Sequence, residues 1–357
     1  HFMAAIPATC KKIAVLDRTK ESGSLGEPMY LDVRSALSEV GKCDIQVVGG
    51  RYGLGSKEFN PTMVKAVFDN LKADAPKNHF TVGIVDDVSG TSLPMGEKID
   101  ASAEGAKSCL FYGFGSDGTV GANKNSIKII GDHTNLYAQA YFAYDSKKSG
   151  GITVSHLRFG KKPIKSTYLI DSADFVACHK PAYVTSYDMV SPLKEGGVFL
   201  LNSPWTAEEM EEKLPAAMKQ ALAQKKAKFF NVDAIDLAQK TGMGGRINTI
   251  MQAAFFKLAS VIPYEDADRY MKEYVKKSYG KKGEAVVKQN QDAIDIAISG
   301  LKEIPVPAAW ATATTGATPV KVEADEYFDS VVLPILVQEG DKLPVSAFSP
   351  DGVVPTG

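Results

Sequence analysis

FYGFGSDGTVGANKNSIKII, residues 111–130, is the stretch from which the predicted fold is built outward. An apolar run from Leu110 to Phe114 predicts a buried strand. Glycines at positions 113, 115, 118 and 121 then divide a polar loop, and from Asn123 onward apolar residues recur every three to four positions, as they do in a helix. The stretch therefore predicts a strand, a glycine-rich turn and a helix.

The glycine-rich turn has the features of an anion-binding loop. Glycine tolerates positive φ and leaves room for a ligand against the backbone, and the free amides that begin a helix carry the positive end of its dipole. The GxGxxG spacing is that of a dinucleotide-binding turn, although a purely structural tight turn has the same spacing. The candidate contacts are Gly115, Ser116, Asp117, Gly118 and Thr119 as a backbone cradle, with Asn123 and Lys124 extending it at the start of the helix.

A second polar turn, DSKKSGG at 145–151, follows the next predicted strand at 137–144. In a doubly wound sheet the carboxyl ends of neighbouring strands line one crevice, so this turn is expected beside the first. Lys147 and Lys148 would suit the phosphate of a phosphorylated ribose, while Asp145 lies slightly late for an acid that binds ribose hydroxyls. A solvated lysine pair is the alternative interpretation.

A third glycine-rich turn, residues 242–245, precedes a helix whose apolar residues recur every three to four positions as a core-facing stripe. Arg246 and Asn248 lie in the first turn of that helix, where they could hold an anion or a carbonyl group and bound the far side of the site. An ordinary glycine-rich helix cap would have the same sequence.

Composition narrows the class of protein. The 357 residues are 44% hydrophobic and 23% charged, enough apolar content for two domains with cores. A net charge of −1 offers no basic surface for nucleic acid, and no apolar run is long enough to span a membrane, so neither is expected as a partner. The four cysteines form no CxxC pair and the histidines no zinc spacing, so no metal ligand and no catalytic residue is assigned.

Alternating strand and helix patterns predict an α/β protein. Residues 13–85 alternate strand, helix, strand, helix and strand, and further strands are expected at 152–157, 166–170, 175–178, 197–201 and 228–232. We predict two domains with open, mostly parallel sheets flanked by helices, plus an extended C-terminal linker. The predicted boundaries are a first domain at 1–89, a linker at 90–105, a second domain at 106–305 and the final linker at 306–357.

Residues 113–170, from GFGSDGTVGANK to KSTYLI, closely resemble the pyruvate:ferredoxin (flavodoxin) oxidoreductases. The resemblance extends to KKIAVLDRTKESGSLGEPMYLDV at 11–33, GGRINTIMQAAFFKLASVIP at 244–263 and GDKLPVSAFSPDGVVPTG at 340–357. It implies that the chain is a central fragment of such an enzyme. The first domain would be its transketolase C-terminal-like domain, the second its gamma domain, and the final linker would lead toward a ferredoxin-like domain.

The resemblance also implies the reaction and partners of the parent enzyme. Pyruvate would be decarboxylated on thiamine diphosphate, electrons would pass through [4Fe-4S] clusters to ferredoxin or flavodoxin, and coenzyme A would take the acetyl group. Thiamine diphosphate, Mg and the clusters are expected in domains outside this chain, and coenzyme A in the second domain. The parent is expected to be a homodimer in the cytoplasm or an organelle of anaerobic type. This fragment alone is expected not to turn over pyruvate.

Two other functions fit the same residues. A free-standing NADP-dependent oxidoreductase would use the same GxGxxG turn and lysine pair, because NADP also carries a phosphorylated ribose. A structural scaffold between catalytic domains would bind no ligand and would need the glycines only for packing.

Overall fold

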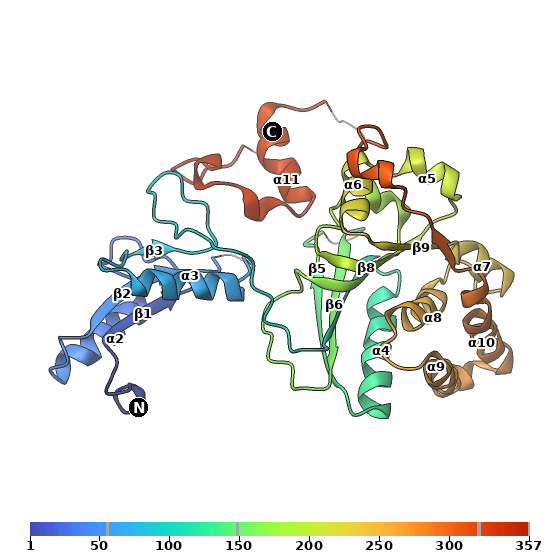
Figure 1. Ribbon diagram of the computed structural model, residues 1–357, viewed down its shortest axis with the longest axis horizontal. Helices are drawn as coiled ribbons and strands as arrows, with labels where there is room; N and C mark the ends of the chain where they lie inside the picture. Colours follow the sequence, from blue (N-terminus) through green and yellow to red (C-terminus); the bar gives the residue numbers. More distant parts are fainter. Residues whose placement is uncertain (55–56, 148–149, 320–322, 356–357) are drawn as a thin grey trace. The chain divides into compact units, whose positions relative to one another are not determined.

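The computed structural model describes residues 1–54, 57–147, 150–319 and 323–355. Figure 1 shows the chain, which divides into two compact units: His1–Ala101 with Val322–Gly357, and Ser102–Lys321. Each unit has its own sheet and its own hydrophobic core. The predicted linker at 306–357 is thus shared between the units. Its first part joins the second unit, because Trp310 is buried in a core of that unit.

The first unit is built on a parallel three-stranded sheet in the order β1-β2-β3, as the strand and helix patterns predict. Helix α3 begins at Pro61, because the Asn60 side chain accepts a hydrogen bond from the Met63 amide and proline fits the first turn. The elements are β1 (Lys12–Asp17), β2 (Gln46–Arg51), β3 (Phe80–Thr81), α1 (Phe2–Ala5), α2 (Pro28–Glu39) and α3 (Pro61–Lys72).

The C-terminal segment packs onto this first unit in short helical turns. The Val345 amide donates to the Val85 carbonyl at 2.8 Å, and Ser346 donates through its amide and hydroxyl to the Asp87 carboxylate at 3.0 and 2.5 Å. The C-terminal segment is therefore folded onto the first unit in helical turns, whereas the sequence predicts an extended linker there. The turns are η4 (Phe328–Val332), α11 (Leu333–Leu336), η5 (Gly340–Lys342) and η6 (Val345–Ala347).

The second unit is built on a mixed sheet of seven strands in the order β10-β9-β8-β7-β4-β6-β5. Strands β4, β7, β8 and β9 run parallel, whereas β6 is antiparallel to both β4 and β5, and β10 is antiparallel to β9. The α/β class is confirmed, but this sheet is mixed, because a short hairpin joins β5 to β6. The strands are β4 (Lys107–Phe114), β5 (Tyr137–Tyr144), β6 (Ile152–Gly160), β7 (Ala173–Cys178), β8 (Leu193–Asn202), β9 (Lys228–Val232) and β10 (Lys302–Ile304).

Helices cover both faces of the seven-stranded sheet (Figure 1). The core of the first face is centred on Phe111, Phe175 and Phe255, whose ring centroids lie 5.0 to 5.6 Å apart. Helices α4 (Thr119–His133), α7 (Ala234–Lys240), α8 (Asn248–Ala259), α9 (Tyr264–Tyr279) and α10 (Glu284–Ser299) pack there, with η2 (Gly280–Lys282) between the last two. The opposite face carries η1 (Pro181–Thr185), α5 (Ala207–Lys213), α6 (Ala216–Gln224) and η3 (Ala308–Thr312).

The prediction of a strand at 166–170 is wrong, because this segment has irregular backbone. Its backbone groups form hydrogen bonds with polar side chains of β6. The Tyr168 carbonyl accepts from Nη2 of Arg158 at 2.7 Å, and the Ile170 amide donates to Nδ1 of His156 at 3.1 Å. These backbone groups are therefore engaged with side chains rather than with a strand partner.

Candidate functional site

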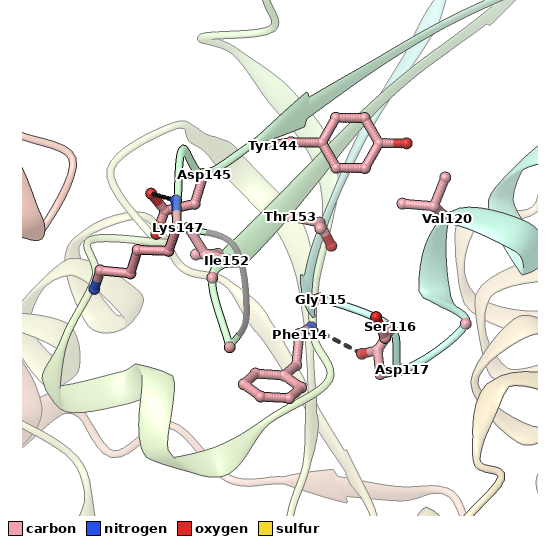
Figure 2. Close-up of a pocket in the computed structure, with 13 residues that line it drawn as sticks. Phe114, Gly115, Ser116, Asp117, Val120, Tyr144, Asp145, Lys147, Ile152 and Thr153 are labelled. Atoms are coloured by element: carbon pink, nitrogen blue, oxygen red, sulfur yellow. Dashed lines mark hydrogen bonds between the residues drawn. The ribbon is translucent and has the colours of Figure 1, made fainter.

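A cavity of about 340 Å³ lies between the start of α4 and the hairpin that joins β5 to β6 (Figure 2). The first two of the three predicted turns, the glycine-rich loop before α4 and the 145–151 turn, contribute residues to its wall. Its lining residues are Phe114, Gly115, Ser116, Asp117, Gly118, Val120, Tyr144, Asp145, Lys147, Gly150, Gly151, Ile152 and Thr153.

The two turns meet because β6 lies between the ends of β4 and β5. Thr153 of β6 pairs with Gly113 of β4 on one side and with Tyr144 of β5 on the other. Beyond the strands, the Gly115 amide donates to the Gly151 carbonyl at 2.9 Å and so ties the first turn to the second. The predicted proximity of the turns is confirmed, but an antiparallel hairpin produces it instead of two adjacent parallel strands.

Asp117 holds the loop before α4 together from the inside. Its carboxylate accepts hydrogen bonds from the Phe114 amide at 2.8 Å, the Thr119 amide at 2.7 Å and the Thr119 hydroxyl at 2.8 Å. Ser116 and Gly118 adopt left-handed backbone angles, with φ of 73° and 88°. Asp117 and the Thr119 amide are thus used within the loop, whereas the amides of Val120 and Gly121 donate to no acceptor among the described residues.

A buried polar chain continues from this loop across the carboxyl edge of the sheet. Because the Thr119 hydroxyl donates to Asp117, Nδ1–H of His179 is the donor in the 2.8 Å contact between His179 and Thr119. Nδ2 of Asn202 donates to the His179 carbonyl at 2.9 Å, and Oδ1 of Asn202 accepts from the backbone amide of Ala234 at the start of α7. Burial lowers the pKa of His179 to about 4, so its ring is neutral at pH 7.

Asn248 of α8 lies directly against the loop, although it does not line the cavity. Its Nδ2 donates to the Asp117 carbonyl at 2.5 Å, and its Oδ1 is buried without a partner in the described chain. A Cβ at Gly118 would collide with the same Nδ2, so this position needs glycine both for space and for φ. Asn123, 3% exposed, likewise has a buried Nδ2 with no partner among the described residues.

The predicted basic residues are dispersed around the cavity. Lys147 lines it, and its amide donates to Oδ1 of Asp145 at 3.2 Å; Lys148 lies outside the described residues. Nζ of Lys124 lies 5.4 Å from the centroid of the Phe142 ring, over β5. Arg246 is exposed and bonds through Nε to the Met243 carbonyl at 3.2 Å. Of these residues, Lys147 is therefore the one that the structure places on the cavity wall.

Three neighbours of the cavity carry no sequence motif. Nζ of Lys180 lies 4.0 Å from the Phe114 ring centroid, because β7 ends beside β4. The Tyr183 hydroxyl donates to the Gly113 carbonyl at 3.4 Å, and burial, followed by Tyr187 and Asp117, raises the pKa of Tyr183. Thr153 forms part of the cavity wall. Strand order brings these residues to the turn, and residue spacing along the chain carries no signal of strand order.

The corresponding edge of the first unit contains carboxylates that are already engaged. Asp17, at the end of β1, accepts from the amides of Met29 and Tyr30 at 2.9 and 3.1 Å. Arg51, at the end of β2, lies 3.5 Å from Oε1 of the buried Glu27. The Asp17 carboxylate thus occupies the free amides at the start of α2, where an external anion would otherwise bind. The second unit is therefore the candidate for anion binding.

In the part of the chain that the structure describes, there is neither a group of metal-ligating side chains nor a helix that could span a membrane. No cluster of three or more His, Cys, Asp or Glu side chains is arranged there to hold a metal ion. None of the helices in that part combines the length and the apolar character that a bilayer span requires.

The comparisons with known proteins converge on one family. The family model described as pyruvate ferredoxin/flavodoxin oxidoreductase matches residues 108–300, and a domain of unknown function matches 314–357. A pyruvate:ferredoxin oxidoreductase of Moorella thermoacetica is 60% identical over all of this chain and 30% of its own length. A pyruvate-flavodoxin oxidoreductase of Enterobacter agglomerans is 51% identical, with the same coverage. The mitochondrial pyruvate dehydrogenase [NADP(+)] of Euglena gracilis is 48% identical over all of this chain and 20% of its own length.

Two solved structures show a partial likeness to the chain. Subunit PORC of the Thermotoga maritima pyruvate oxidoreductase has a TM-score of 0.45 and 19% identity, over 55% of this chain and 97% of its own. A 2-oxoglutarate:ferredoxin oxidoreductase of Magnetococcus marinus, solved with 2-oxoglutarate, coenzyme A and succinyl-CoA, has a TM-score of 0.43 and 18% identity, over 62% and 33%. The chain spans about 30% of the length of the first two curated relatives. It belongs to the pyruvate ferredoxin/flavodoxin oxidoreductase family.

Proposed function

We propose that the second unit binds coenzyme A for the oxidative decarboxylation of pyruvate to acetyl-CoA, with ferredoxin or flavodoxin as the electron acceptor. The observation that carries the proposal is the cavity of about 340 Å³ between the start of α4 and the hairpin. Family membership supplies the reaction, and the cavity supplies a place for its thiol substrate.

The cavity suits a phosphorylated nucleotide. The unpaired amides of Val120 and Gly121 lie at the positive end of the α4 dipole, where an anion is stabilised. Lys147 adds a charge at the wall, and the half-buried ammonium of Lys180 over the Phe114 ring adds another nearby. Coenzyme A has two groups for this arrangement, its diphosphate and its ribose phosphate.

Roles for the predicted site residues follow from their places. Gly115, Ser116 and Gly118 would shape the backbone cradle, while Asp117 and Thr119 fix its conformation from within. Asn123 and Asn248 each have an unsatisfied amide atom beside the loop. Lys147 would meet the ribose phosphate together with Lys148, and Lys124 and Arg246 would add charge farther from the cavity wall.

The two buried cysteines of the second unit do not fit the ligand set of an iron–sulfur cluster. Cys109 and Cys178 are fully buried, and burial raises the pKa of the Cys178 thiol to about 12, with the pKa of Cys109 raised as well. Cluster ligands are thiolates, so no electron-transfer step is assigned to these residues. Thiamine diphosphate, Mg and the clusters are proposed to lie in other parts of a parent homodimer. The first unit would then serve domain and subunit contacts.

Parallel calorimetric titrations of the chain with coenzyme A, dephospho-coenzyme A and NADPH test the proposal. Binding of coenzyme A, weakened by about fivefold or more when the ribose phosphate is missing, is the expected result. Preference for NADPH would indicate an NADP-dependent oxidoreductase instead. Absence of binding by all three ligands would contradict the assignment of a nucleotide site to this chain and would favour a scaffold.

A further inference from the structure

Thr153 of β6 places a buried hydroxyl at the wall of the cavity. The residue is only 5% exposed, and its Oγ1 has no hydrogen-bond partner within the described residues. Most buried polar side-chain atoms do have a partner, because leaving one unsatisfied costs the full free energy of removing it from water. An unpaired hydroxyl in a cavity wall is therefore a group to which a ligand can bond.

The Thr153 side chain lies on the face of the sheet that α4 covers. Thr153 is the cross-strand partner of Gly113, and paired residues direct their side chains to the same face. A Cβ on Gly113 would lie 2.7 Å from Cβ of Thr119, the first residue of α4. Figure 2 accordingly shows Thr153 between Tyr144 and the loop at Gly115 and Ser116.

Two independent features thus coincide beneath the first turn of α4. One is the Thr153 hydroxyl, which has no partner among the described residues, and the other is the open amide of Val120; both residues line the cavity, and the open amide of Gly121 follows in the same turn. The nearby Asp117 carboxylate does not fill this space, because three donors from Phe114 and Thr119 hold its oxygens within the loop. Oδ2 of Asp145, an acceptor on the hairpin side of the cavity, is also buried without a partner among the described residues. Beneath α4 the open groups are backbone amides and a hydroxyl, which can donate to an acceptor with several oxygens.

We infer that Thr153 donates a hydrogen bond to a phosphoryl oxygen of the ligand's diphosphate, which the first turn of α4 holds. This inference rests on the proposed coenzyme A function and divides the ligand between two subsites. Thr153 with the α4 amides binds the diphosphate, and Lys147 on the hairpin binds the ribose phosphate. Thr153 is a binding residue of the site, and no covalent step is assigned to it.

The test replaces Thr153 by Val, which keeps the shape of the side chain and removes the hydroxyl. The affinity for coenzyme A and for dephospho-coenzyme A is expected to fall by the same factor, about tenfold, because both ligands carry the diphosphate. Thr153→Ser, which keeps the hydroxyl, is expected to bind within about twofold of the unchanged chain. Should the Val variant unfold, the comparison of Thr153→Ser with Thr153→Ala gives the same answer.

Ser155 provides a matched control two residues along β6 on the same face. It is fully buried and its Oγ also lacks a partner among the described residues, but it does not line the cavity. Ser155→Ala is expected to leave the affinity unchanged. Equal affinity of the unchanged chain and Thr153→Val would overturn the inference, and so would an equal loss in Thr153→Val and Ser155→Ala.

The same titrations separate this inference from the proposed function. If the unchanged chain binds NADPH and not coenzyme A, the coenzyme A proposal fails, while the diphosphate contact is still measured, because NADPH carries a diphosphate too. A tenfold loss of NADPH affinity in Thr153→Val would then support the contact, and no loss would refute it. If the unchanged chain binds neither ligand, both proposals are overturned.

Discussion

Gly118 and Asn248 are fitted to each other at the point where the loop meets α8. Gly118 has a φ of 88°, and an added Cβ would meet Nδ2 of Asn248, which donates to the Asp117 carbonyl. A substitution there therefore strains the backbone and displaces the amide that holds the loop. Gly118 is therefore needed for its backbone angle and for the space beside Asn248. These two requirements place a glycine at this position of the GxGxxG pattern.

Gly118→Ala is expected to lower the free energy of unfolding by about 1–3 kcal/mol, because L-residues disfavour this φ and the Asn248 contact is lost. Gly131→Ala is the control. Gly131 lies within α4, which Gly118 precedes as the N-cap, and nothing lies within 4 Å of its added Cβ. The control variant is expected to raise the free energy of unfolding by about 0.5–1 kcal/mol, the difference in helix propensity. Urea denaturation measures both, and shifts of the same sign would contradict this view of the loop.

His156 and His179 are buried, and burial lowers the pKa of each to about 4 from 6.5. Between pH 6.5 and about 4, each is protonated in the unfolded chain but neutral in the folded one. The unfolded state then binds more protons, so the free energy of unfolding falls as the pH decreases through this window, by up to about 1.4 kcal/mol per pH unit for each histidine. Above pH 6.5 this contribution to stability is fully present.

His179→Gln is expected to reduce that pH dependence by up to one proton, whatever its effect on stability at pH 7. Urea denaturation at pH 6.5, 5.5 and 4.5 gives the slope for the unchanged chain and the variant. Identical slopes would show that His179 is not held neutral beside Thr119.

The hairpin between β5 and β6 is the element that places a basic residue at the cavity. Lys147 is exposed there, next to the Asp145 turn that its own amide stabilises. An exposed ammonium binds a phosphate modestly, because water screens the charge. The hairpin is thus expected to adjust ligand preference and not to supply most of the affinity.

Lys147→Ala is expected to weaken coenzyme A by about three- to tenfold and to leave dephospho-coenzyme A unchanged, since only the ribose phosphate distinguishes the two ligands. Lys128→Ala removes an exposed lysine of α4 that does not line the cavity, and it should alter neither affinity. Calorimetric titration of both variants decides the matter. Equal losses for both ligands in Lys147→Ala would remove the ribose phosphate role.

Local patterns predict the elements better than their pairing. The strand, turn and helix around Phe111 to Ile130 follow from apolar spacing and glycines. That β6 runs antiparallel between β4 and β5 did not follow, because strand patterns do not encode the partner or its direction. For the same reason Thr153 and Lys180 were missed. Asp117 was predicted as part of a backbone cradle, and the use of its carboxylate within its own loop did not follow from the sequence.

On the scale of the whole molecule, the polar groups at the sheet edges differ between the two units. In the first unit Asp17 and Glu27 occupy the amides and the arginine that an anion would need. In the second unit the corresponding edge keeps open amides, an unpaired hydroxyl and a cavity. This difference explains why we place the nucleotide in the second unit and contact functions in the first.

The most direct measurement is hydrogen–deuterium exchange of the chain with and without saturating coenzyme A. Slower exchange is expected in peptides that contain Val120 and Gly121 and in those that contain Tyr144 and Thr153, because a bound diphosphate would accept hydrogen bonds from the open amides and contact both sides of the cavity. Peptides from β1 and α2 should be unchanged. Binding of coenzyme A with no protection at these turns, or with protection confined to the first unit, would contradict the central claim.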